Sequence, residues 1–310
     1  MTHKTALLFA GQGAQYTGMG RDLAEDFPSS RPWLEQSRAL LGFDLPALCA
    51  QGPEEELTKT ENAQPAIFLT SWLAFQLLKE RVPGFAFQAA AGLSLGELTA
   101  LTAAGVFEFG DGLKTARQRG RFMQEACDAT RGSMAAVLGL DLAAMRAVCA
   151  EADVEVANLN CPGQIVISGE TEKIGRACQL AKGKGAKRAV PLPVAGAYHS
   201  RLMAGARPKV AAMLAAVSIN FPAAAVISNV TARPHTTPDA IAARLAEQVT
   251  SEVRWEDSMR YLLEQGFTRF IELGPGTTLC GFLKRIDPGA QSFNIADAAS
   301  LEATVRGLAA

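Results

Sequence analysis

The segment GLSLGE, from Gly92 to Glu97, decides the fold of this chain of 310 residues. It follows a short apolar run, Phe85 to Ala91, and opens a helical pattern that continues to Ala104. A strand, a glycine turn and a helix in this order are the opening of an α/β unit. The motif Gly-x-Ser-x-Gly in that setting predicts a nucleophile elbow, because the tight turn excludes bulky side chains on either side of Ser94. The alternative is a structural glycine turn that carries no chemistry.

The same order of elements opens the chain. An apolar run from Thr5 to Ala10 ends at the glycine loop GQGAQ, Gly11 to Gln15, and we expect a helix from about Met19. Further strands are expected at Ala225–Asn229 and Arg269–Leu273. Further helices are expected at Ala66–Lys79, Gly110–Ala126, Leu202–Val217, Ala240–Gln248 and Trp255–Gln265.

Between these segments the order of the elements changes. Apolar runs predict strands at Ser133–Leu140, Val154–Leu159, Gln164–Ser168 and Lys187–Val194, with helices at Leu142–Glu151 and Glu172–Lys182. The resulting order, βαββαβ, is that of ferredoxin-like domains. We therefore expect an inserted small domain at residues 127–195 and a large domain formed by residues 1–126 and 196–310.

Composition argues against several classes of protein. The 30 Lys and Arg residues against 31 Asp and Glu give a net charge of −1, so no global basic field favours nucleic acid. The longest wholly apolar run, Val210 to Val217, is far shorter than the roughly 18 residues of a membrane span. The six cysteines form no CxxC pair, which indicates reduced cysteines in a cytoplasmic protein. The three histidines lie far apart, so we expect no metal site.

A serine nucleophile needs a base, which is usually histidine. His199 lies where the chain re-enters the large domain from the insert, and it is either that base or a surface residue. His3 lies near the N-terminus and His235 in a loop rich in Thr and Pro, and we expect both to be partly exposed surface residues.

Arg119 lies on a different face of its expected helix from the other polar residues. It shares a stripe with Ala116, Phe122 and Met123. A guanidinium among apolar neighbours requires an anionic partner. That partner is either a protein carboxylate or a carboxylate-bearing substrate held by two parallel N–H···O bonds.

Seven local sequences together resemble the malonyl-CoA:acyl carrier protein transacylase family and the related acyltransferase domains of polyketide synthases. They occur in family order over nearly the whole chain: GQGAQ (11–15), ENAQPA (61–66), GLSLGE (92–97), RQRGRFMQ (117–124), NCPGQIVISG (160–169), GAYHSRLM (196–203) and GPGTTLCGFLKR (274–285). The resemblance implies an α/β-hydrolase-like large domain with a parallel sheet and a ferredoxin-like insert. It also implies ping-pong transfer of a malonyl group, through a malonyl-serine, from malonyl-CoA to the phosphopantetheine thiol of an acyl carrier protein.

The resemblance further implies catalytic roles for single residues. Ser94 matches the nucleophile and His199 matches its base. Gln12 and Leu95 match the two backbone amides of the oxyanion hole. Gln248 matches the residue whose backbone carbonyl orients the histidine.

Substrate-binding roles follow from the same resemblance. Arg119 matches the arginine that pairs with the malonyl carboxylate, and Gln64 matches a glutamine near the site. Tyr198, directly before the histidine, and Leu95 are of the type that goes with malonyl rather than methylmalonyl. No metal or redox cofactor is implied.

Leu93 departs from the family pattern, which usually has histidine directly before the nucleophile. That side chain is not the base, so we expect activity to survive. A serine hydrolase such as a thioesterase would use the same elbow without needing Arg119, and a non-enzymatic homologue has only Leu93 in its favour. The sequence does not separate fatty-acid synthesis from polyketide synthesis or malonate decarboxylation.

Positive charge on the insert indicates where a carrier protein docks. The stretch from Lys173 to Arg188 contains no acidic residue. Acyl carrier proteins are acidic, so we expect steering by this stretch, although a merely solvated helix face is the alternative. The expected contacts are Lys182, Lys184, Lys187 and Arg188. We expect a monomer that binds neither nucleic acid nor membrane.

Overall fold

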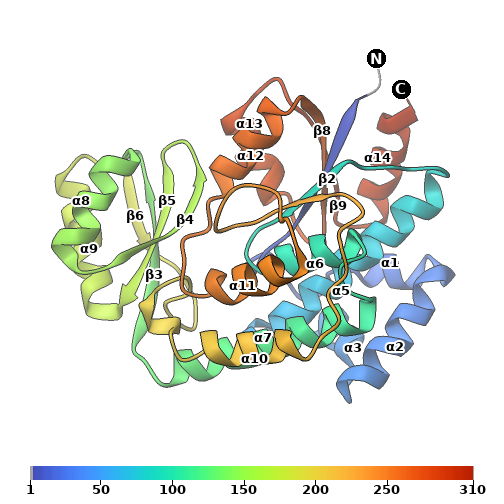
Figure 1. Ribbon diagram of the computed structural model, residues 1–310, viewed down its shortest axis with the longest axis horizontal. Helices are drawn as coiled ribbons and strands as arrows, with labels where there is room; N and C mark the ends of the chain where they lie inside the picture. Colours follow the sequence, from blue (N-terminus) through green and yellow to red (C-terminus); the bar gives the residue numbers. More distant parts are fainter. Residues whose placement is uncertain (1–2, 310) are drawn as a thin grey trace.

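Two β-sheets organise the chain, and they confirm the expected fold class (Figure 1). The structure is a computed structural model that describes residues 3–309. The larger sheet has the order β7-β2-β1-β8-β9 and all its strand pairs are parallel. Its strands are β1 (Lys4–Phe9), β2 (Ala89–Gly92), β7 (Ala225–Ile227), β8 (Phe267–Leu273) and β9 (Gln291–Ile295).

Both faces of the central strands β1 and β2 are buried, which explains why these two strands are nearly continuous apolar runs rather than alternating ones. In β1, Leu7 and Phe9 contact one core cluster, while Ala6 and Leu8 contact the other. The first face is covered mainly by α5 (Thr60–Arg81), α6 (Gly96–Ala103), α7 (Phe109–Asp128) and α14 (Ala298–Ala309). The second face is covered by α12 (Trp255–Glu264) and α13 (Thr278–Ile286).

The smaller sheet is antiparallel, with the order β4-β5-β3-β6. Its strands are β3 (Gly132–Leu138), β4 (Glu155–Cys161), β5 (Gln164–Glu170) and β6 (Arg188–Pro191). Helices α8 (Leu142–Ala152) and α9 (Thr171–Gly183) pack on it and close a separate core. This order and chain path are those expected for the ferredoxin-like insert. The division of the chain at residues 126 and 196 stays a prediction.

Several expected elements differ in length. The helix expected from Leu202 to Val217 is wrong, because the structure has a 3-10 turn (Arg201–Met203) and then α10 (Arg207–Ala215). Pro208 lies in the first turn of α10, where a residue without a backbone N–H is tolerated, so the helix begins there. The helix expected from Met19 is only α1, five residues from Arg21 to Glu25.

Other elements were not anticipated. These are β9, α13 and α14, described above, and α2 (Arg31–Leu41), α3 (Leu45–Gln51) and α4 (Glu54–Thr58). Helix α11 (Pro238–Gln248) begins two residues before its expected start. Across residues 3–309, no helix combines the length and apolar character that a membrane crossing requires.

Candidate active site

Ser94 lies at the sharp turn between β2 and α6, with φ of 53°. A side chain at either flanking glycine would collide with backbone: a Cβ at Gly92 would lie 1.9 Å from the Gly96 carbonyl carbon, and one at Gly96 would lie 2.2 Å from the Phe9 oxygen. The two glycines are therefore required by close backbone approach. The positive φ of a serine is a strained conformation of the kind found at functional sites.

His199 lies against this serine. Its Nε2 is 2.7 Å from Ser94 Oγ, and its Nδ1 is 2.9 Å from the Gln248 carbonyl oxygen. A carbonyl only accepts, so Nδ1 carries the proton and Nε2 presents its lone pair to the serine. Burial, together with the positive charge of Arg119, lowers the pKa of His199 to about 4, which leaves the imidazole neutral at pH 7.

The glycine loop after β1 packs against the elbow. A Cβ at Gly11 would lie 2.4 Å from the Leu93 carbonyl oxygen, so only glycine permits this approach. Gln12 and Ser94 then line one cavity. Among the hydrogen bonds of residues 3–309, the backbone amides of Gln12 and Leu95 have no protein acceptor. Free amides on the two loops beside a nucleophile are what an oxyanion hole needs.

Arg119 is 2% exposed and reaches the nucleophile from α7. Its Nη2 donates to Ser94 Oγ at 3.1 Å and to Gln248 Oε1 at 2.8 Å, and its Nη1 donates to Gln64 Oε1 at 2.7 Å. Within residues 3–309 it forms no ion pair with a carboxylate, so a protein salt bridge is not its role. Burial lowers the pKa of Arg119 to about 10, against the opposing charge of Glu97, and the side chain stays cationic at neutral pH.

The structure thus brings together all the residues matched from the sequence. Gln64 also links the arginine to the glycine loop, donating to Gln12 Oε1 at 3.3 Å. Tyr198 lies beside them, with its hydroxyl 2.5 Å from Thr60 Oγ1 and 3.3 Å from Gln12 Nε2.

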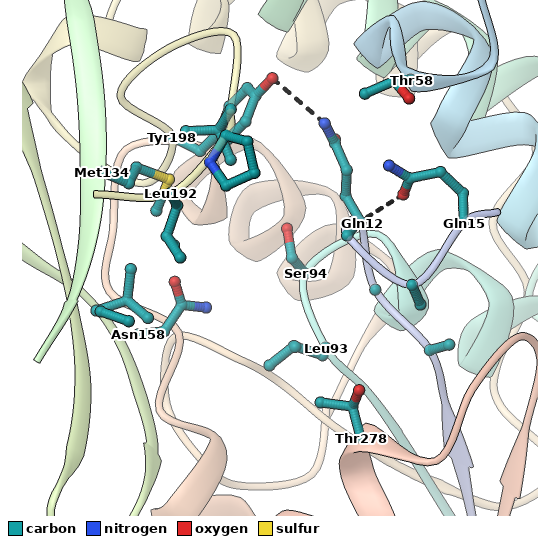
Figure 2. Close-up of a pocket in the computed structure, with 18 of the residues that line it drawn as sticks. Gln12, Gln15, Thr58, Leu93, Ser94, Met134, Asn158, Leu192, Tyr198 and Thr278 are labelled. Atoms are coloured by element: carbon teal, nitrogen blue, oxygen red, sulfur yellow. Dashed lines mark hydrogen bonds between the residues drawn. The ribbon is translucent and has the colours of Figure 1, made fainter. Parts of the chain in front are cut away.

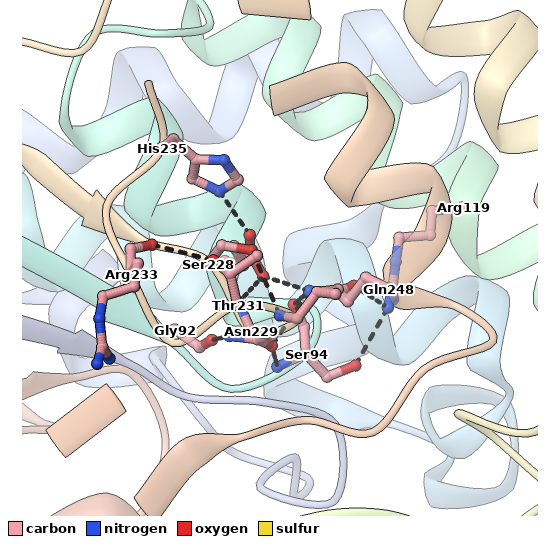
Figure 3. Close-up of polar contacts among 11 residues, drawn as sticks. Gly92, Ser94, Arg119, Ser228, Asn229, Thr231, Arg233, His235 and Gln248 are labelled. Atoms are coloured by element: carbon pink, nitrogen blue, oxygen red, sulfur yellow. Dashed lines mark hydrogen bonds and ion pairs between the residues drawn. The ribbon is translucent and has the colours of Figure 1, made fainter. Parts of the chain in front are cut away.

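Three polar residues behind the elbow were missed by sequence reasoning, and Figure 3 labels two of them, Asn229 and His235. They are Glu97, Asn229 and His235, and each is at most 8% exposed. The expectation that His235 is a partly exposed surface residue is wrong, since its ring is buried against the Glu97 carboxylate at 2.7 Å. The signal for Glu97 was available: an acidic side chain in an otherwise apolar helical segment, three positions after the nucleophile.

A cavity of about 710 Å³ opens in front of Ser94 (Figure 2). Its size fits a site for a small ligand. The smaller sheet contributes Met134 and Asn158 to its wall, and α13 of the larger domain contributes Thr278 and Leu279. Leu93 also lines it and packs on the apolar cluster under α12 and α13. Within residues 3–309, no three His, Cys, Asp or Glu side chains gather where a metal ion could be held.

The basic stretch of the insert is exposed at the end of α9 and along β6. Lys184 lies 3.8 Å from Glu151, and Lys173 pairs with Asp153 and Glu170. Acidic residues from other segments therefore offset part of the charge that the sequence shows. Within residues 3–309, Lys182, Lys187 and Arg188 form no ion pair.

Comparison with known proteins identifies the family of this chain. The family model described as "Acyl transferase domain" matches residues 6–306. The malonyl CoA-acyl carrier protein transacylase of Bacillus subtilis is 42% identical over 310 residues, which cover 98% of this chain and 97% of that protein. Its Escherichia coli K12 counterpart is 42% identical over 285 residues, 91% of this chain and 92% of that protein.

Solved structures give the same result. The malonyl CoA-acyl carrier protein transacylase of Coxiella burnetii superposes with a TM-score of 0.95 at 35% identity, covering 99% of this chain and 98% of that one. A malonyl-transacylase solved in complex with its type II polyketide acyl-carrier protein also has a TM-score of 0.95, at 38% identity, covering 98% of this chain and 99% of that one.

Proposed function

Because this chain belongs to the acyl transferase family, among the malonyl-CoA:acyl carrier protein transacylases, we propose that its active site carries a malonyl group as an ester of Ser94. The enzyme is an acyltransferase that moves malonyl from malonyl-CoA to an acyl carrier protein, for fatty-acid or polyketide synthesis. The observation that carries the residue assignment is the contact of one serine oxygen with both a neutral imidazole and a buried guanidinium.

The first half-reaction forms the acyl-enzyme. His199 Nε2 takes the proton from Ser94 Oγ, which attacks the thioester carbonyl of malonyl-CoA. The carbonyl oxygen becomes an oxyanion, stabilised by the amides of Gln12 and Leu95. One such donor typically lowers the barrier by about 3–4 kcal/mol.

The intermediate then collapses. The C–S bond breaks, the imidazolium of His199 gives its proton to the departing thiolate, and coenzyme A leaves with malonyl bound to Ser94 through oxygen. The Gln248 carbonyl, 2.9 Å from Nδ1, keeps the ring in the tautomer that both proton transfers require.

The second half-reaction repeats these steps with a different thiol. His199 takes the proton of the phosphopantetheine thiol, the sulfur attacks the malonyl ester, and Ser94 regains its proton. The second thiol must outcompete water, since hydrolysis would waste the acyl group.

Arg119 supplies the preference for a dicarboxylic acyl group. Malonyl carries a free carboxylate one carbon beyond the reacting carbonyl, and an unpaired charge in this buried site would cost several kcal/mol. The guanidinium offers a fork of N–H donors to that carboxylate. Gln64 and Gln248 fix the fork in place, since each accepts a hydrogen bond from it.

The carrier protein docks, in this proposal, on the exposed basic residues at the end of α9 and at the start of β6, namely Lys182, Lys184, Lys187 and Arg188. Positive charge there would steer an acidic partner. We further propose that the enzyme is a cytoplasmic monomer and that it needs neither a metal ion nor a redox cofactor.

The test is intact-mass analysis after incubation with malonyl-CoA, with and without phosphopantetheinylated carrier protein. We expect a malonyl adduct on the enzyme alone and its transfer to the carrier protein when both are present. An enzyme that releases free malonate at the same rate with or without carrier protein would be a hydrolase instead.

A further inference from the structure

We propose that Glu97 and His235 are positioning residues for malonyl transfer: this buried pair fixes Asn229 and Gln248, which in turn set the nucleophile elbow and Arg119. The inference rests on the proposed function. Neither member of the pair lines the cavity, so any effect on the reaction passes through other residues.

The pair is closed off from solvent. The side chains of Glu97 and His235 are each 1% exposed, with His235 Nε2 2.7 Å from Glu97 Oε1. Glu97 Oε2 accepts from the backbone N–H of Asn229 at 3.0 Å and from the side-chain Nε2 of Gln248 at 2.6 Å. A buried carboxylate is stable only when its oxygens are hydrogen-bonded, so loss of any donor disturbs the others.

Asn229 transmits this arrangement to the elbow. Its Oδ1 accepts from the Ser94 amide at 2.7 Å, and its Nδ2 donates to the Gly92 carbonyl at 2.7 Å. The side chain thus holds the turn directly before the N–Cα bond of Ser94, whose φ is a strained 53°. A strained backbone conformation persists only where its surroundings over-determine it.

Gln248 transmits the arrangement to Arg119 (Figure 3). A glutamine amide can point either way, and its neighbours decide which end faces where. Glu97 only accepts, so it draws Gln248 Nε2 toward itself and leaves Oε1 facing Arg119 at 2.8 Å. The main-chain oxygen of the same residue accepts from His199 Nδ1 at 2.9 Å. One residue therefore orients both the base and the arginine.

His235 serves this network as a donor. The acceptor-only carboxylate requires an N–H at His235 Nε2, while Nδ1 has no hydrogen-bond partner in residues 3–309. A neutral ring leaves only a bare lone pair at Nδ1, whereas a second proton there would be a buried N–H without an acceptor. The ring is thus suited to donate one hydrogen bond, and it lies outside the substrate cavity.

The test compares His235→Leu, which has no donor, with His235→Gln, whose amide nitrogen can take the place of Nε2. The readout is the kcat/KM for malonyl-CoA divided by the kcat/KM for acetyl-CoA, both measured on the same enzyme preparation. We expect His235→Leu to lower this ratio about 10- to 100-fold, because small misplacements of catalytic groups have effects of that size. We expect His235→Gln to restore most of it.

Glu97→Gln tests the acceptor of the same hydrogen bonds, those from His235 and Gln248, with almost no change in side-chain shape. We expect a similar fall in the ratio. The matched control is Leu301→Ala. This substitution leaves a cavity in the core beside α14, away from the active site. It should lose stability and keep the wild-type ratio, since the amount of folded protein does not affect a ratio of two substrates.

A wild-type ratio in folded His235→Leu or folded Glu97→Gln would overturn the inference. So would equal ratios in the two His235 variants, or the same fall in Leu301→Ala. A wild-type enzyme that forms no malonyl ester would overturn the proposed function itself, and it is distinguished by measuring the wild type first.

Discussion

Arg119 Nη2 lies 3.1 Å from Ser94 Oγ, so the guanidinium touches the atom that is to carry the acyl group. The positive charge of Arg119 therefore lies where the acyl group of the substrate will be, and not against a protein carboxylate. Any acyl group attached to Ser94 extends from that oxygen into a site that already holds a buried cation. An acyl group with its own anion is favoured there, which distinguishes this elbow from that of a general serine hydrolase.

Replacing Arg119 should separate malonyl from acetyl transfer. Arg119→Ala removes the partner of the malonyl carboxylate, and we expect a loss on the order of 3–5 kcal/mol in malonyl acylation. Acetyl acylation, which involves no charge, should be nearly unchanged. Arg119→Lys should rescue only in part, because it restores charge without the fork of donors. The measurement is kcat/KM for both thioesters, and equal losses would make Arg119 a structural residue.

The acylation rate should be almost independent of pH over the neutral range. His199 acts as a base only when unprotonated, and burial lowers its pKa to about 4, so the neutral form persists as pH falls well below 6.5. Pre-steady-state acylation measured between about pH 5 and 8 should therefore be flat. A histidine with its ordinary pKa would give about a tenfold fall one unit below that value, and such a profile would contradict the assignment.

Tyr198 should make the enzyme select malonyl over methylmalonyl. The ring is 6% exposed and its hydroxyl is fixed by Thr60 Oγ1 at 2.5 Å, so it cannot move aside for an extra methyl group. We expect that methyl to cost about 1–3 kcal/mol in kcat/KM. Tyr198→Ser should reduce the discrimination. Comparable kcat/KM values for the two thioesters in the wild type would refute this expectation.

Charge reversal on the insert should weaken carrier-protein binding. In Lys182→Glu/Lys184→Glu, we expect KM for the carrier protein to rise at low salt and the effect to fade as salt screens it. Lys184 already lies near Glu151, so Lys182→Glu alone should account for most of the change. Lys79→Glu, on α5 of the large domain, is the control. An unchanged KM at low salt would place the docking site elsewhere.

The sequence was sufficient for residues whose local pattern dictates one structure. Gly92 and Gly96 permit a backbone approach that any Cβ would prevent, so the elbow is readable from spacing alone. The alternation of strands and helices in the insert likewise predicted its ferredoxin-like class, and the sheet has the strand order of that class. The family motifs then singled out His199 and Gln248, which are far from Ser94 in sequence and lie within hydrogen-bonding reach in the fold.

What could not be predicted depends on tertiary contacts. His235 lies in a loop whose composition indicates solvent exposure, and only the packing of that loop behind α6 buries it against Glu97. The start of α10 was also missed. The Ala-rich sequence favours one long helix from Leu202, but the helix begins only at Arg207, where Pro208 lies in its first turn. The strand β9 is half exposed, and its pairing with β8 defines it more than its own composition does.

The account depends most on Ser94 being the residue that carries malonyl. The most direct measurement is peptide mapping by mass spectrometry of the enzyme trapped with malonyl-CoA in the absence of carrier protein, for the wild type and Ser94→Ala. We predict one malonylated peptide, with the adduct on Ser94, and no adduct in Ser94→Ala. A malonyl adduct on another residue, or one that survives in Ser94→Ala, would contradict the account.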